Sequence, residues 1–383
     1  MAIDDHDFID PEPWITAKPQ ARKGRGAVTN IAGRYETQLI ETVDDGWAPH
    51  EDDTDIHPGL KTFVTPELAK TILSRNQSPD IPFGVSINPY RGCEHGCIYC
   101  FARPTHAYLG LSPGLDFETR LYAKTNAAEV LRRELAHKNY APSPIAFGVN
   151  TDAYQPCERD LKITRQCLEV FHECDHPVGM ITKSALIERD IDLLQDMAKK
   201  NLAAAAITIT TLDHNISRIL EPRAASPTRR LQTIERLVKA GIPTMVSVAP
   251  IIPFITEQEI EKVLSAAADA GATAAGYTVL RLPWEINPLF QEWLQTHFPE
   301  RAERVMNRIR DMRGGKDYDA NFATRMRGEG LWADMIRQRF MKGLKRYGLD
   351  KSRRYGELDC TSFRKPLSIP GRESRNGQMD IFG

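Results

Sequence analysis

The chain has 383 residues, a formal net charge of −1, 41% hydrophobic residues and 26% charged residues. These values are typical of a soluble globular protein with one or two domains. No stretch of about twenty apolar residues occurs, which argues against a membrane-spanning helix, and the acidic start of the sequence argues against a secretory signal. We therefore expect a cytoplasmic protein whose cysteines stay reduced.

Charge is distributed unevenly along the chain. Residues 1–60 hold 13 acidic and 5 basic residues, a balance of −8, whereas residues 301–375 hold 20 basic and 10 acidic residues, a balance of +10. A positive C-terminal region favours contact with the phosphates of a DNA or RNA substrate. The alternative is that both regions are simply solvated helices and tails.

Residues 1–80 are predicted to form a partly irregular N-terminal extension, because Pro, Gly and acidic residues dominate residues 1–60 with little periodicity. Within this extension, residues 23–30 read Lys-Gly-Arg-Gly-Ala-Val-Thr-Asn and are glycine-rich and basic. They lack the strand–loop–helix setting of a phosphate-binding loop, so no nucleotide-binding role is predicted for them.

Residues 81–290 alternate short, β-branched apolar runs with longer amphipathic stretches, which predicts strands alternating with helices. The predicted strands are 83–90, 145–150, 178–182, 204–210, 244–252 and 274–280. The predicted helices are 126–138, 160–174, 189–200, 227–240 and 256–270. This alternation is typical of an α/β fold with a parallel sheet. Six units suit a partial (β/α)6 TIM-like barrel, with ligands at the carboxyl ends of the strands.

Three cysteines occur within eight residues, in the order Cys93, Cys97 and Cys100. Three thiolates on one short loop can converge on a metal centre and leave one coordination position open, as a site doing chemistry requires. Crowded cysteines are also typical of iron–sulfur clusters. Gly92 and Gly96 allow the backbone to curl around a bulky centre without a side-chain clash.

An aromatic residue, Tyr99, stands just before the third cysteine, and the cysteine loop follows the first predicted strand. This arrangement resembles the radical S-adenosylmethionine (SAM) superfamily. The resemblance implies a [4Fe-4S] cluster on Cys93, Cys97 and Cys100, with SAM at the open iron and Tyr99 against its adenine. It also implies that an external one-electron reductant drives cleavage of SAM to a 5′-deoxyadenosyl radical.

A zinc site is the alternative for the cysteine loop. A second pair of cysteines at zinc spacing is absent from the sequence. His95 and His106 lie nearby, however, so a Cys3His zinc site stays open at this point.

Polar residues at the predicted strand ends are candidates for binding SAM. The segment from Thr151 to Pro156 resembles the subgroup of the superfamily that contains spore photoproduct lyase, and Asn150 or Asp152 would serve the SAM amino group. A plain turn would also use such residues. Lys183 is costly at the end of an apolar strand unless it is paired, and relatives in this subgroup use a lysine there for the SAM carboxylate.

The later strands offer further candidates with weaker support. Thr210 suits the ribose or carboxylate, Arg223 could bind a carboxylate or phosphate, and Ile252 could contact the adenine. Cys157 is a candidate catalytic hydrogen-atom donor, although a structural thiol is the alternative.

The C-terminal part is predicted to form a helical cap at residues 291–350 and a flexible tail at 351–383. Near its end stand Gln378, Met379, Asp380, Ile381 and Phe382. This pattern resembles the peptide that docks into the bacterial sliding clamp, with the apolar residues as anchors. The alternative is a tail that packs on its own domain.

The predicted function is therefore a lyase-like radical SAM enzyme that acts in DNA repair or nucleic-acid modification. Two alternatives remain. One is radical modification of a protein or small molecule, and the other is a non-enzymatic metal-binding or iron–sulfur module.

Overall fold

The computed structural model describes residues 21–35, 60–350 and 357–366. The predicted sliding-clamp peptide, residues 378–382, lies outside these ranges. Among the helices that the structure describes, none is both long and apolar enough to cross a lipid bilayer.

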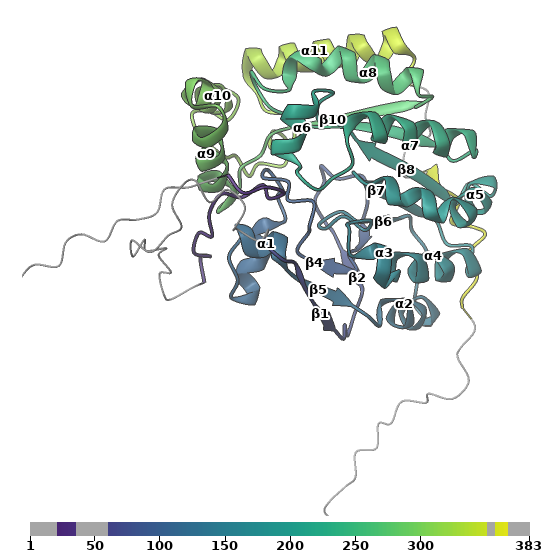
Figure 1. Ribbon diagram of the computed structural model, residues 1–383. Coiled ribbons are helices and arrows are strands. Elements are labelled where there is room, and N and C mark those ends of the chain that lie inside the picture. Colours follow the sequence, from purple (N-terminus) through teal and green to yellow (C-terminus); the bar gives the residue numbers. More distant parts are fainter. Residues whose placement is uncertain (1–20, 36–59, 351–356, 367–383) are drawn as a thin grey trace, which may run out of the picture.

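A seven-stranded sheet in the order β10-β9-β8-β7-β6-β3-β2 forms the centre of the fold (Figure 1). Six strands run parallel, one at each predicted position: β3 (Val85–Ile87), β6 (Ile145–Phe147), β7 (Val178–Thr182), β8 (Ala203–Thr208), β9 (Thr244–Ile251) and β10 (Ala274–Val279). The seventh strand, β2 (Leu73–Arg75), is antiparallel to β3. Within the described residues the two outer strands have one neighbour each, so the sheet is open. The predicted parallel α/β architecture is confirmed.

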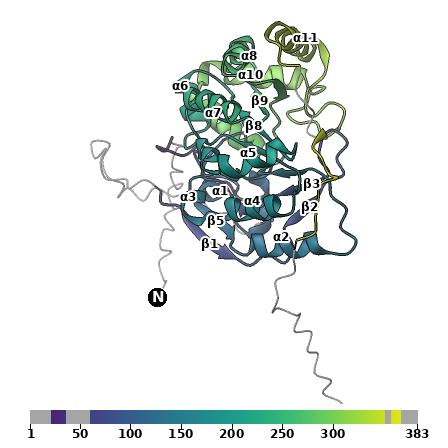
Figure 2. The same cartoon turned by 90° about the vertical axis from the view of Figure 1, so that its right-hand side faces the viewer.

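Helices connect consecutive parallel strands and cover the outer face of the sheet (Figure 2). The principal helices are α2 (Ala127–Ala136), α4 (Ile163–Glu173), α5 (Ile191–Lys199), α7 (Pro227–Lys239) and α8 (Ile260–Asp269). The helix predicted at 160–174 is interrupted, because Lys162 has φ of 54° and separates α3 (Glu158–Leu161) from α4. Similarly, the stretch before α5 forms a 3-10 helix, η2 (Ala185–Asp190).

Apolar packing between strands and helices fixes the sheet. Phe147 of β6 is fully buried and makes an edge-to-face contact with Phe171 of α4, with ring centroids 6.2 Å apart. Ile145 is level with Val85 of β3 and Val178 of β7 in the strand register. Because all six strands run the same way, their carboxyl ends lie along one edge, where loops can assemble a site.

A second, three-stranded sheet in the order β1-β5-β4 lies beside the main one. It contains β1 (Phe63–Glu67), β4 (Tyr90–Arg91) and β5 (Arg120–Lys124). The cysteine loop leaves β4 and leads into the 3-10 helix η1 (Arg103–Leu109) and α1 (Leu115–Thr119). The predicted N-terminal extension, residues 1–80, thus contributes strands to both sheets.

The region predicted as a helical cap is helical, but its helices occupy two places (Figure 1). The first two, α9 (Ile286–His297) and α10 (Pro299–Asp311), follow β10, and the predicted boundary at residue 290 falls inside α9. The third, α11 (Gly330–Tyr347), lies along α8. Gly343 allows this close approach, since a β-carbon there would stand 2.5 Å from a methyl group of Leu264.

Residues 357–366 fall within the predicted tail but pack against the body of the protein. Phe363 contacts the rings of His176 and Tyr140, with centroids 5.3 and 5.5 Å away. Arg364 pairs with Asp175, and Asp175 and His176 lie just before β7. The segment therefore lies at the amino ends of the strands, opposite the cysteine loop.

Candidate active site

The cysteine loop turns tightly at two glycines. The backbone N–H of Gly96 donates to Cys93 O over 3.4 Å, and that of Cys100 donates to Cys97 O over 3.2 Å. Gly92 and Gly96 have φ of 75° and 67°, and a β-carbon at Gly92 would lie under 3 Å from its neighbours. The predicted need for both glycines is confirmed, since left-handed backbone in a crowded place disfavours any side chain.

The three cysteines of the loop are free thiols, two of them buried and Cys100 half-buried. Burial raises the pKa of Cys97 to about 12. Burial, Asp152 and the other two thiols raise the pKa of Cys93 well above its usual value. Buried thiols of this kind lose their protons readily only beside a strong positive charge, which a metal centre supplies. The donor set therefore suits an iron–sulfur cluster with thiolate ligands.

The histidines that would complete a zinc site are engaged elsewhere. His95 Nδ1 lies 3.3 Å from Asp152 Oδ2, and His106 Nε2 lies 2.9 Å from Arg120 O. Among the described residues, no three His, Cys, Asp or Glu side chains are placed to hold a single metal ion. This finding argues against the Cys3His zinc site. It does not argue against a four-iron cluster, because the thiolates of such a cluster bind different irons.

A buried polar network lies directly beneath the cysteine loop. Glu221, which follows α6 (His214–Leu220), accepts hydrogen bonds from Tyr99 OH and, over 2.6 Å, from Thr210 Oγ1. Its second oxygen is paired with Arg230 of α7, whose Nη1 donates to Thr208 O over 2.9 Å. The loop, the end of β8 and the start of α7 are thereby held together by one carboxylate.

Lys183 follows β7 and adds a second cation to this network. Its Nζ stands 5.7 Å from the ring centroid of Tyr99. Burial opposes the charged form, but Cys97 and Glu221 outweigh it and raise the pKa of Lys183. Arg230 and Lys183 in turn hold the pKa of Glu221 below its usual value despite burial. The buried Arg230 and the half-buried Lys183 thus both act on Glu221, an arrangement that favours a further anionic group.

Asp152 is occupied by protein donors. Its Oδ1 accepts from Thr182 Oγ1 over 2.7 Å and from the N–H of Tyr154 over 2.9 Å, and its Oδ2 accepts from the N–H of Lys183 over 2.8 Å. Burial alone would raise the pKa of Asp152, but His95 and these hydrogen bonds lower it to about 2. The carboxylate therefore fixes the end of β7 and the cysteine loop.

The remaining predicted residues are placed around this network. Asn150 is exposed and binds Asn88 through its backbone N–H. Arg223 pairs with Glu94 of the cysteine loop over 3.0 Å. Ile252 is fully buried in the same apolar cluster as Tyr99. Cys157 is half-buried, and burial followed by Glu94 raises the pKa of its thiol.

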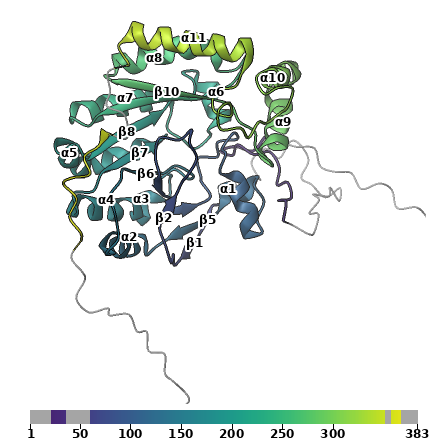
Figure 3. The ribbon, with the colours of Figure 1, turned by 180° about the vertical axis from the view of Figure 1, so that it is seen from behind.

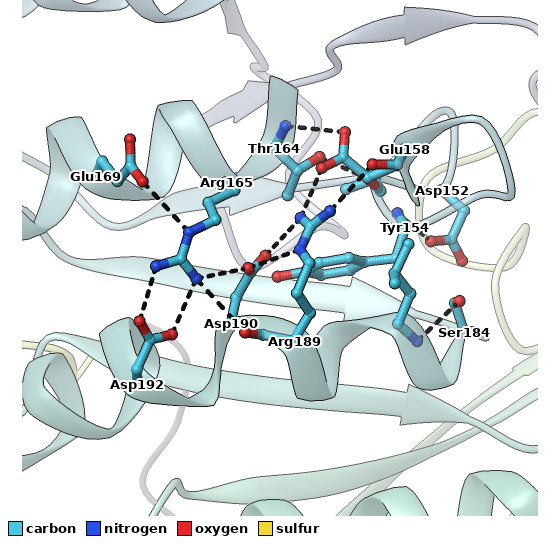
Figure 4. Close-up of polar contacts among 12 residues, drawn as sticks. Asp152, Tyr154, Glu158, Thr164, Arg165, Glu169, Ser184, Arg189, Asp190 and Asp192 are labelled. Atoms are coloured by element: carbon cyan, nitrogen blue, oxygen red, sulfur yellow. Dashed lines mark hydrogen bonds and ion pairs between the residues drawn. The ribbon is translucent and has the colours of Figure 1, made fainter. Parts of the chain in front are cut away.

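Ion pairs anchor the segment that carries Asp152 and Cys157 (Figure 4). Arg189 bridges Glu158 and Asp190 over 2.7 and 2.8 Å, and Arg165 reaches Asp190 over 3.1 Å. Glu158 is buried and also accepts from the N–H of Thr164 over 3.0 Å. These ion pairs join the segment after β6 to η2 and α4, and so provide the supporting scaffold that a precise site requires.

The glycine-rich N-terminal segment packs directly on the cysteine loop. A β-carbon at Gly26 would stand 1.8 Å from Gly96 O, so only glycine fits there. Glu118 accepts from the N–H groups of Gly26 and Ala27 over 3.0 and 2.8 Å, and from Arg103 over 2.5 Å. Figures 1 and 3 show this dark purple segment between α1 and α9. It covers the loop from the outside.

Sequence reasoning missed the residues that support the loop: Glu221, Arg230, Glu118, Arg103 and Gln155. Gln155, for example, binds the N–H of Glu94 and the carbonyl of Gly92 over 2.9 and 3.2 Å. These partners are separated by 61 and 63 residues, and no local spacing signals such pairs. The glycine-rich motif at 23–30 was the one visible signal of the covering segment.

Comparisons with known proteins agree with this geometry. The Radical SAM superfamily matches residues 87–267. An uncharacterised protein of Mycobacterium tuberculosis is 35% identical over 240 residues, which cover 62% of this chain and 71% of that protein. An uncharacterised protein of Methanocaldococcus jannaschii is 26% identical, over 58% of this chain and 79% of its own length. A radical SAM Nα-GlyT isomerase of Pseudomonas phage M6 is 25% identical, over 59% of this chain and 46% of its own length.

Among solved structures, a spore photoproduct lyase variant matches with a TM-score of 0.50 and 15% identity, over 75% of this chain and 80% of that one. This likeness concerns the fold. The family match shows that the chain belongs to the radical SAM superfamily and is an enzyme. Membership implies a [4Fe-4S] cluster and SAM as cofactors, as predicted.

Proposed function

We propose that Cys93, Cys97 and Cys100 hold the [4Fe-4S] cluster and leave one iron open for SAM. The observation that supports this most directly is the glycine-turned loop itself, which carries three buried or half-buried thiols at the carboxyl ends of parallel strands. When bound, the two cofactors supply the reductive SAM cleavage and hydrogen abstraction of the family. The polypeptide binds, orients and shields the reactants.

The protein residues have distinct proposed roles toward SAM. Lys183 meets the carboxylate, because its Nζ lies beside Tyr99 of the loop and the neighbouring Glu221 is already paired with Arg230. Tyr99 and Ile252 belong to one apolar cluster and form the adenine wall. Asn150 serves the amino group rather than Asp152, whose oxygens already accept protein donors.

Two further residues complete the proposed site. Thr210 orients Glu221 and, through it, Tyr99. Arg223 holds Glu94 and so steadies the cysteine loop from its exposed side. Cys157 is the proposed hydrogen-atom donor, because its half-buried thiol stays neutral next to the loop.

The proposed substrate class is nucleic acid, and the proposed role is repair or modification in the cytoplasm. Support comes from the positive balance of residues 301–375, with 20 basic against 10 acidic residues. Part of this charge lies on α11, where Arg337, Arg339, Lys342, Lys345 and Arg346 outnumber Asp334. Polyanions bind such surfaces through their phosphates.

Anaerobic reconstitution with iron and sulfide tests the proposal. We expect a brown protein that forms 5′-deoxyadenosine when reduced with SAM present. Incubation with deuterated DNA should transfer deuterium into 5′-deoxyadenosine, since the radical abstracts hydrogen from the substrate. A colourless protein would refute the cluster. Deuterium transfer from a protein or small molecule but not from DNA or RNA would refute the substrate class.

We also propose that residues 378–382 dock into the bacterial sliding clamp. Deleting residues 378–383 is expected to abolish clamp binding measured by surface plasmon resonance, because Met379, Ile381 and Phe382 supply the apolar anchors. Replacing Arg372 and Arg375 with glutamine is the matched control, which should keep the affinity within about threefold because surface charges contribute little. Equal clamp binding by the truncated protein would contradict this proposal.

A further inference from the structure

Large aromatic side chains are exposed beside the cysteine loop. Phe101, Tyr108 and Trp284 are 41%, 67% and 64% exposed, and Tyr35, which is 55% exposed, packs its ring 5.2 Å from that of Tyr108. Clustered apolar groups in contact with water are typical of binding surfaces, because their exposure lowers stability without a compensating gain. None of the proposed roles toward SAM uses them.

Phe101, Tyr108 and Trp284 come from two short segments at the site. Phe101 directly follows the proposed cluster ligand Cys100, so its Cα lies roughly 3.8 Å from that of the ligand, and Tyr108 lies further along the same segment, in η1. Trp284 lies in the connection between β10 and α9, just beyond the carboxyl end of β10. A flat group on Phe101 would therefore lie next to the proposed cluster.

Arginine side chains join the two segments. The guanidinium carbon of Arg34 stands 4.1 Å from the ring centroid of Trp284 and 6.0 Å from that of Tyr108. Arg34 forms an ion pair with Glu285, with its Nε 3.0 Å from Glu285 Oε1. Arg281 in turn lies over Phe101 at 5.2 Å. We name Phe101, Tyr108, Trp284, Arg34 and Arg281 the aromatic platform.

The carboxylates near Arg281 interact mainly with other arginines. Its neighbour Arg325 forms a bidentate ion pair with the carboxylate of Asp80, with N–O distances of 2.6 and 2.8 Å. Arg313 donates to backbone carbonyls, and Asp319 faces it. Tyr318 also faces Arg281. Glu329 also acts on Arg313, and no described carboxylate forms an ion pair with Arg281.

We propose that the aromatic platform binds single-stranded nucleic acid, with unstacked bases on Phe101 and on Trp284 and a phosphate at Arg281. This inference rests on the proposed function and specifies its substrate. Aromatic faces bind bases only when the bases are out of the duplex stack, and arginine suits the adjoining phosphate. A duplex presents phosphates but no base faces.

Fluorescence anisotropy with a labelled twelve-residue oligothymidylate tests the inference on the full chain. We expect Trp284→Ala and Phe101→Ala each to weaken binding by roughly 5- to 150-fold, which corresponds to about 1–3 kcal/mol of stacking per base. Arg281→Gln should reduce the slope of log affinity against log salt by about 0.7, the loss of one phosphate contact. Trp284→Ala keeps the test informative if Phe101→Ala disturbs the loop.

Matched controls are Phe63→Ala, which removes another exposed aromatic residue on β1, and Arg236→Gln on α7. Both should bind like the parent protein. Equal or tighter binding of duplex DNA or of an acidic peptide would overturn the inference, as would parent-like binding by the platform variants. Formation of 5′-deoxyadenosine by the same samples is scored separately. A sample that bound the oligonucleotide but formed no 5′-deoxyadenosine would contradict the proposed function and would still support nucleic-acid binding by the aromatic platform.

Discussion

Replacing Cys93 with alanine is expected to abolish cluster assembly and formation of 5′-deoxyadenosine. The loop holds three thiols, and removing one leaves too few ligands for three irons of the cluster. Even substitutions outside the ligand set lower metal affinity by about 10–100-fold, so loss of a ligand should exceed 100-fold. Iron and sulfide content after anaerobic reconstitution measures the effect, and Cys97→Ala and Cys100→Ala should behave alike.

Cys360→Ala is the matched control, because this half-buried thiol lies in the packed C-terminal segment rather than on the loop. Its cluster content and SAM cleavage should equal those of the parent protein. If the three loop variants retained their iron and their activity, the assignment of the cluster to this loop would be wrong.

Replacing Glu118 with alanine is expected to lower the free energy of unfolding by about 3–5 kcal/mol, because it leaves the charge of Arg103 buried without its partner. Both side chains of this pair are fully buried. Arg103 would keep its bonds to the carbonyls of Gly96 and Cys97, while the N–H groups of Gly26 and Ala27 would lose their acceptor. Urea unfolding of the unreconstituted protein measures the change.

Glu173→Ala is the matched control, since its pair with Arg132 lies on the surface. It should change stability by no more than about 1 kcal/mol. If Glu118→Ala lowered the free energy of unfolding by no more than this, the contacts of Glu118 with Arg103 and with the glycine-rich N-terminal segment would contribute little to stability. Faster bleaching of the cluster by oxygen in Gly26→Ala would support its shielding role independently.

The sequence predicted the strands and helices well, because β-branched runs and helical periodicity reflect burial directly. Phe147 and Val178, for instance, lie in strands at the predicted positions. The interruption at Lys162 was not predicted, since a left-handed backbone at lysine leaves no mark in hydrophobic periodicity. The positions of α9 and α11 also depend on tertiary packing rather than on local pattern.

The candidate site was predicted only where its residues are close together in the sequence. Cys93, Cys97, Cys100 and Tyr99 are neighbours in sequence, so their spacing alone indicates a shared centre. Glu221 contacts Tyr99 across 122 residues, and that pairing exists only in the folded chain. Long-range carboxylate–guanidinium contacts of this kind are invisible to spacing arguments.

The docking of residues 357–366 has a consequence for how this enzyme is held. Arg364 and Phe363 attach the C-terminal segment to the start of β7, on the side of the protein opposite the cysteine loop. A protein that bound residues 357–366 would therefore leave the opposite side of the enzyme, where the cysteine loop lies, accessible to other molecules.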